Sequence, residues 1–120
     1  MTGKSAVIIE DNVDIAEVYA ATLEMLGFDT EVVTDGQRAL HVLERAIPQL
    51  VVLDMNLPQV SGHYIYKSIR ANPRLHDTVV FIATANTVIA SALRDDVRSQ
   101  DHITIKPVSP SELSEFASSL

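Results

Sequence analysis

The middle of the chain reads Val51-Val52-Leu53-Asp54-Met55-Asn56-Leu57-Pro58. A short apolar run that stops at a proline-containing turn predicts a buried β-strand. Asp54 is then the last residue of this strand, at the edge of a sheet where open α/β folds bind their ligands. A second apolar run, at residues 6–9, leads directly into Glu10 and Asp11. Three carboxylates at two strand ends suggest a divalent-cation site beside a nucleophile.

Similar apolar runs recur along the chain and alternate with segments that have helical spacing. Strands are expected at residues 6–9, 30–33, 50–53, 79–83 and 102–105. Apolar residues spaced i, i+3, i+4 and i+7 predict amphipathic helices at residues 12–26, 37–46, 62–71, 87–98 and 109–120. Five strand–helix repeats with short connections predict an α/β fold, namely a three-layer α/β/α sandwich. Its parallel sheet is expected to have the flavodoxin-like strand order 2-1-3-4-5.

The same spacing predicts which helical residues face the core. Ile15 and Val18 fall on the apolar stripe of the first helix, and Val88 falls on that of the fourth. In the third helix Tyr64 fits the buried stripe, whereas Tyr66 is expected to be partly exposed.

The composition limits the classes of function. A length of 120 residues suits a single domain spanning residues 1–120. The net charge of −7 argues against direct nucleic-acid binding, which requires basic side chains to neutralise phosphates. There is no cysteine, so disulfides and thiolate metal sites are excluded. No apolar stretch is long enough for a membrane span or a signal peptide, so we expect a cytoplasmic protein without membrane association.

Two further polar residues follow predicted strands at the same edge of the sheet. Thr84 comes directly after residues 79–83, and Lys106 comes directly after residues 102–105. A hydroxyl and an ammonium group can both donate hydrogen bonds to phosphoryl oxygens. The strand order therefore brings three acids, a hydroxyl and a cation toward one crevice.

This ordered set resembles the receiver domains of response regulators, the CheY-like family of two-component signalling, over essentially the whole chain. The family's acidic pair falls on Glu10 and Asp11, and its phosphoacceptor falls on Asp54. The family's motif D-x-x-x-P-x-x-x-G falls on Asp54, Pro58 and Gly62. Its hydroxyl residue falls on Thr84, and its Lys-Pro pair, whose bond is often cis in the family, falls on Lys106 and Pro107.

The resemblance implies a phosphoacceptor rather than a turnover enzyme. Asp54 would receive a phosphoryl group from the phosphohistidine of a histidine kinase or phosphotransfer protein, or from a small phosphodonor. Mg²⁺, or Mn²⁺ in its place, would be bound by Asp11, Asp54 and the backbone carbonyl of Asn56, with Glu10 acting through a water molecule. Thr84 and Lys106 would respond to the phosphoryl group. The signal would pass to a downstream protein or output domain, from a monomer or a phosphorylation-dependent dimer.

The sequence departs from the family pattern at one switch position. The family usually has Tyr or Phe three residues before the lysine, and this chain has Ile103. The neighbouring His102 is expected to be a surface or packing histidine on the other side of the strand. Asn56 and Asn86 lie two residues beyond the phosphoacceptor and the threonine, where side chains are expected to tune the lifetime of the phosphorylated state.

The sequence is compatible with two other functions. A receiver-like interaction module that works without phosphorylation gains some support from Ile103. A phosphohydrolase of the haloacid-dehalogenase type would also use an Asp nucleophile after a strand. That class resembles D-x-D, whereas this chain has Asn56 at the second acidic position and no room for a substrate cap.

Overall fold

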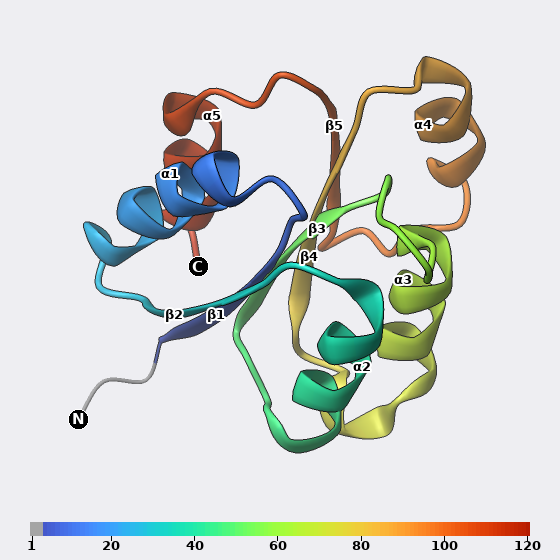
Figure 1. The fold of residues 1–120 in the computed structure, drawn as a ribbon, viewed down its shortest axis with the longest axis horizontal. Helices are drawn as coiled ribbons and strands as arrows, with labels where there is room; N and C mark the ends of the chain where they lie inside the picture. The colour runs from blue at the N-terminus through green and yellow to red at the C-terminus, as the bar shows by residue number, and fades with distance from the viewer. Residues whose placement is uncertain (1–3) are drawn as a thin grey trace.

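The computed structural model describes residues 4–120, which form one five-stranded parallel sheet in the order β2-β1-β3-β4-β5 (Figure 1). The strands are β1 (Ser5–Ile9), β2 (Asp29–Val33), β3 (Leu50–Asp54), β4 (Val79–Thr84) and β5 (His102–Ile105). The helices are α1 (Val13–Glu24), α2 (Gly36–Arg45), α3 (Gly62–Ala71), the short η1 (Pro73–Leu75), α4 (Thr87–Leu93) and α5 (Pro110–Ala117). The predicted fold class, strand order and five α-helices are confirmed.

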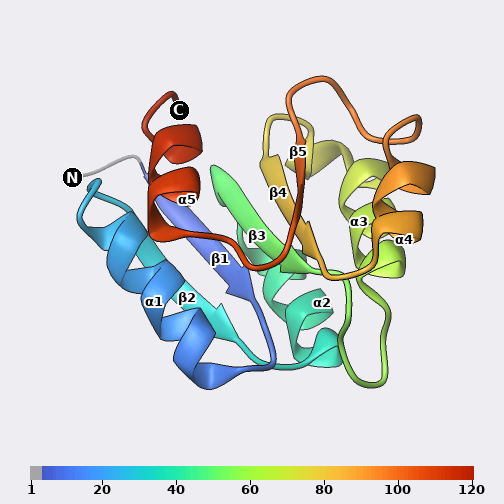
Figure 2. The same cartoon turned by 90° about the horizontal axis from the view of Figure 1, so that it is seen from above.

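The helices cover both faces of the sheet. Seen from above, α1 and α5 lie together on one face, while α2, α3 and α4 lie on the other (Figure 2). The central strand β3 is buried along its whole length. Val51 and Leu53 pack toward α2, α3 and α4, whereas Leu50 and Val52 pack toward α1 and α5. Each such side chain stabilises the fold by about 1.5–3 kcal/mol relative to exposure.

In three helices the predicted apolar stripe is buried only in part, since some of its residues are exposed. Ile15 and Val18 are 36% and 47% exposed. Val88 is 74% exposed, and Tyr64 is 59% exposed while Tyr66 is only 3% exposed. In α1 and α4 the buried face includes the alanines Ala16 and Ala90. In α3 the Tyr66 hydroxyl has polar partners in the interior.

Helix α4 is shorter than predicted, since it ends at Leu93 rather than at residue 98. The Asp96 N–H donates to the Leu93 carbonyl, three residues back, so the chain tightens and leaves the helix. None of the helices within residues 4–120 has the length and apolar character needed to cross a membrane.

Arg74, in η1, fastens the end of α2. Its guanidinium donates hydrogen bonds to the carbonyls of Leu43, Glu44 and Ala46. These carbonyls belong to the last turn of the helix, where no helical donor follows. One side chain therefore satisfies the exposed end of α2 and ties it to the connection between α3 and β4.

Two glycines shape the connections. Gly27 follows α1 with φ +93°, a conformation that strongly favours glycine. At Gly62, a Cβ atom would lie 2.5 Å from the Cα of Met55 and 2.7 Å from the carbonyl oxygen of Asp54. The start of α3 thus touches the backbone at the end of β3, which holds Asp54 in place.

Candidate functional site

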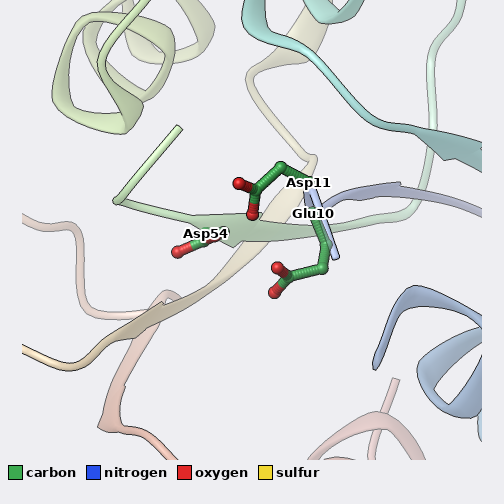
Figure 3. A group of neighbouring side chains, drawn as sticks. All are labelled: Glu10, Asp11 and Asp54. Carbon is green, nitrogen blue, oxygen red and sulfur yellow. The ribbon is translucent and has the colours of Figure 1, made fainter. Parts of the chain in front are cut away.

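Three carboxylates meet at the carboxyl ends of β1 and β3. Glu10 and Asp11 follow β1, and Asp54 is the last residue of β3 (Figure 3). The two strands are neighbours, with Ile9 paired to Leu53. One carboxylate oxygen from each acid lies within 4.8 Å of the others. The predicted convergence of the acids is confirmed.

The acids differ in exposure. Glu10 and Asp54 are 1% and 2% exposed, whereas Asp11 is exposed. The Asn56 N–H donates to Asp54 Oδ1 at 3.0 Å, and the Asn12 N–H donates to Glu10 Oε2 at 3.2 Å. The two buried carboxylates are therefore held in fixed orientations, and Asp11 borders the solvent.

Lys106 is the cation that contacts this cluster. Its Nζ lies 3.2 Å from Glu10 Oε1 and 3.2 Å from Asp54 Oδ1. Burial lowers the pKa of the Lys106 ammonium, but the charges of Asp54 and Glu10 outweigh that effect and raise the pKa above its ordinary value. Lys106 is thus fully charged, and one positive charge faces three carboxylates.

Burial and the neighbouring carboxylate both disfavour the charged form of Glu10. Burial, followed by repulsion from Asp54, raises the pKa of Glu10 from 4.5 to about 7. A divalent cation would relieve this repulsion. The donor set fits Mg²⁺, because its three carboxylates offer oxygen ligands only and Asp11 faces the solvent.

Thr84 borders a second part of the site. It is the last residue of β4, is 2% exposed, and accepts a hydrogen bond from the Asn86 N–H at 3.1 Å. A depression of about 450 Å³ opens beside it and is lined by Met55, Asn56, Thr84, Ala85, Asn86, Thr87 and Ile89. The two asparagines that were expected to tune a phosphoryl lifetime therefore line the same depression as the threonine.

The side chain of Asn86 also has a structural role that the sequence reasoning missed. Its Oδ1 accepts hydrogen bonds from the N–H groups of Val88 and Ile89, which caps α4. The signal was present, since asparagine directly before a helical pattern is a preferred N-cap. Asn86 thus joins the rim of the site to the start of α4.

The structural motif residues lie where the sequence placed them. The peptide bond between Lys106 and Pro107 is cis, as predicted. Pro58 lies in the exposed loop between Asp54 and α3, and Gly62 makes the close backbone contact described above. The Lys106 N–H donates to the Thr84 carbonyl at 2.8 Å, which keeps the ends of β4 and β5 together.

Ile103 is buried on the α4 side of the sheet, 8% exposed and within the apolar cluster that includes Ile82 and Leu93. It offers no hydrogen-bonding group there. His102 points to the other face, where its ring lies 5.1 Å from Phe81 and 5.2 Å from Phe116. The prediction of a packing histidine is confirmed.

Comparisons with known proteins agree with this geometry. Residues 6–118 match the family model for the response regulator receiver domain. The chain is 34% identical over 109 residues to the sensory transduction protein RegX3 of Mycobacterium tuberculosis, covering 91% of this chain and 47% of the relative. It is 32% identical over 114 residues to the phosphate regulon transcriptional regulatory protein PhoB of Pseudomonas aeruginosa, covering 94% and 49%. The chain therefore spans about half the length of these curated relatives.

Two solved structures are similar over nearly the whole chain. A CheY-like receiver domain from Methylobacillus flagellatus has a TM-score of 0.78 and 28% identity, covering 98% of both chains. The receiver domain of the sensor histidine kinase PA1611 from Pseudomonas aeruginosa PAO1 has a TM-score of 0.79 and 26% identity, covering 95% of this chain and 93% of that one. That structure has a magnesium ion coordinated in its active site cleft. The match over residues 6–118 shows that this chain belongs to the response regulator receiver domains, a family of phosphoacceptors rather than turnover enzymes.

Proposed function

We propose that Asp54 accepts a phosphoryl group in a Mg²⁺-dependent reaction and that the phosphorylated domain signals through a change of conformation. The observation that carries this proposal is the meeting of Glu10, Asp11 and Asp54, with Lys106 in contact with two of them. Such a cluster is costly without a cation, because each like-charge pair at about 4 Å costs roughly 4 kcal/mol at an effective dielectric near 20.

The residues divide the chemistry among themselves. An oxygen of Asp54 attacks phosphorus while the P–N bond of a phosphohistidine breaks, and the imidazole leaves with the electron pair. Asp11, Asp54 and the carbonyl of Asn56 would hold Mg²⁺, with Glu10 acting through a water molecule. When bound there, Mg²⁺, or Mn²⁺ in its place, would supply positive charge that offsets the phosphoryl charge. Lys106 adds a fixed positive charge, and its contact with Asp54 keeps the acceptor oxygen oriented.

Thr84 and Asn86 are proposed to carry the response. A phosphoryl group on Asp54 brings strong acceptor oxygens to the rim, and the Thr84 hydroxyl can donate to one of them. Because the Asn86 N–H is bonded to that hydroxyl and the Asn86 side chain caps α4, a movement of Thr84 changes the support of the helix. Asn56 and Asn86 line the depression through which water would approach, and they are proposed to set the phosphoryl lifetime.

The proposed donor is a histidine kinase or a phosphotransfer protein. The proposed recipient of the signal is a downstream protein or an output domain. An output domain as the recipient is supported by the length of the relatives, about twice that of this chain, and by the name of PhoB as a transcriptional regulatory protein.

The test uses acetyl phosphate and a beryllofluoride mimic with Mg²⁺. We expect intact-mass spectrometry to show one added phosphoryl group, and NMR to show amide shifts at Met55, Asn56 and Thr84. Asp54→Asn should lose both signals while keeping the folded spectrum. Absence of any shift near Asp54 in the wild-type domain would refute the proposal.

A phosphorylation-independent interaction module is the second candidate, because Ile103 is buried and lacks a polar group to respond to Thr84. The two candidates differ in one comparison. If signalling depends on the phosphoryl group, acetyl phosphate induces the binding of an output partner to the wild type but not to Asp54→Ala. Equal partner binding by the wild type and Asp54→Ala would favour the second candidate.

A further inference from the structure

A buried polar cluster lies where β4 and β5 begin, at the opposite end of the strands from Asp54. Its centre is Asp101, directly before β5, whose side chain is 0% exposed. Asp101 Oδ1 accepts a hydrogen bond from the Val80 N–H at 2.8 Å, and Oδ2 accepts one from the Tyr66 hydroxyl at 2.6 Å. The carboxylate thus joins the starts of β4 and β5 to α3.

Tyr66 fastens a second point of the same segment. Its hydroxyl donates to Asp101 and accepts a hydrogen bond from the Arg98 N–H at 3.1 Å. Burial, followed by the bond to Asp101, raises the pKa of Tyr66 to about 12, so the hydroxyl keeps its proton at every physiological pH. One tyrosine on α3 therefore holds both ends of the stretch from Arg98 to Asp101.

Arg70 supplies the positive charge for the buried carboxylate. It lies one turn after Tyr66 on α3, its side chain is 10% exposed, and its Nε is 3.8 Å from Asp101 Oδ2. Its Nη2 donates to the Thr78 carbonyl, and its own carbonyl accepts from Arg98 Nη2 at 3.4 Å. A buried charge that lost this partner would be strongly destabilising, so the cluster favours one position of the segment.

The segment that the cluster holds, from Arg98 to Asp101, follows α4 in the chain. Helix α4 has two buried residues, Ala90 and Leu93, and it begins at the Asn86 cap beside Thr84. Ile103 gives it no polar link to β5. The segment after α4 shares a pocket of about 450 Å³ with α3, lined by His63, Tyr66, Lys67, Arg70, Ala71 and Asp96. Helix α4 thus has few buried residues along its length, whereas the segment beyond its end is hydrogen-bonded to Tyr66.

We propose that Tyr66, Arg70 and Asp101 form an anchor, here called the Tyr66 anchor, which stops the response to phosphorylation at Arg98. The response then involves α4 and the turn after it, and it leaves the start of β5 in place. In this chain a tyrosine on α3, rather than an aromatic residue at position 103, fixes the position of the α4–β5 segment. The existence of the anchor is independent of the proposed function, whereas its effect on the response rests on it.

The first measurement needs no phosphoryl group. Tyr66→Phe removes only the hydroxyl, and Tyr64→Phe is the matched control, since Tyr64 lies on the same helix and is exposed. Amide hydrogen exchange at Arg98 should become about tenfold faster in Tyr66→Phe, because the Arg98 N–H loses the hydroxyl that accepts its hydrogen bond. It should be unchanged in Tyr64→Phe. Equal Arg98 exchange in all three proteins would overturn the anchor.

The second measurement maps amide shifts on adding beryllofluoride with Mg²⁺. In the wild type they should extend from Asp54 through α4 and end before Arg98, and in Tyr66→Phe they should continue to Asp101. Wild-type shifts that reach Asp101 as strongly would overturn the proposed limit. If no shifts arise at Asp54, the proposed function fails, and the exchange data still decide whether the anchor exists. Asp101→Asn, which keeps the side-chain shape, provides the same two measurements should Tyr66→Phe unfold.

Discussion

Replacing Glu10 with glutamine tests the electrostatics of the acid cluster directly. In the metal-free domain the pKa of Glu10 is about 7 instead of 4.5, because its carboxyl is buried and lies near Asp54. A carboxyl whose pKa is higher in the folded state stabilises the protein fully below the unfolded pKa and loses that contribution as pH rises through the folded pKa. The metal-free domain should therefore become less stable between about pH 5 and about pH 8.

The size of the effect follows from the shift. Each pKa unit corresponds to about 1.4 kcal/mol, so the change from 4.5 to about 7 sets an upper limit of about 3 kcal/mol. Glu10→Gln keeps the side-chain shape and removes the titration. The unfolding free energy of the variant relative to the wild type should thus increase with pH by up to about 3 kcal/mol. Glu17→Gln is the control, since Glu17 is exposed and lies outside the acid cluster.

Urea unfolding followed by circular dichroism measures this difference, first in EDTA and then in excess Mg²⁺. The cation should flatten the wild-type curve, because it favours the ionised carboxylates and stabilises the folded state by mass action. Parallel curves for the wild type and Glu10→Gln in EDTA would refute the reasoning, since they would show that Glu10 titrates normally.

Three further substitutions test other parts of the structure. Arg74→Ala should cost about 2 kcal/mol in urea unfolding, because three carbonyls at the end of α2 lose their donor. A cost no larger than that of Arg38→Ala, an exposed arginine on α2, would contradict this role of Arg74. Gly62→Ala should cost about 1–3 kcal/mol and weaken Mg²⁺ binding measured by calorimetry, since its Cβ would meet the backbone next to Asp54. Gly27→Ala, which has no such neighbour, should strain only the turn, and equal Mg²⁺ affinities in the two variants would argue against the contact. Lys106→Met should destabilise the metal-free domain by about 3 kcal/mol at about pH 8, where Glu10 is ionised, and less at about pH 5. Urea unfolding at the two pH values measures this difference, and an equal loss at both would contradict it.

The fold could be predicted because its signals are local and repeated. Buried parallel strands read as short apolar runs, and β3 shows this most clearly, since every residue from Leu50 to Asp54 is buried. The candidate site followed from the strand order, which brings Glu10, Asp54, Thr84 and Lys106 to one edge. Residues at strand ends are placed by topology alone, so their meeting does not depend on the detailed packing.

Features that depend on side-chain partners were not predictable in the same way. Tyr66 is buried with its hydroxyl donating a hydrogen bond to Asp101, thirty-five residues away, and no local pattern reports that contact. The apolar stripe therefore selected Tyr64 instead. The end of α4 was placed too late for a similar reason, because spacing does not reveal where a tight turn at Asp96 ends the helix.

The outer strand β2 has a consequence for the behaviour of the protein in concentrated solution. β2 borders β1 on one side only, and it carries Asp29 and Glu31, the latter 3.7 Å from Arg45. A foreign strand that paired with this border would have to approach these charges, and charged residues on short outer strands are a common protection against such pairing. The other border, β5, has only four residues. We expect the folded domain to resist amyloid-like stacking at both borders of the sheet.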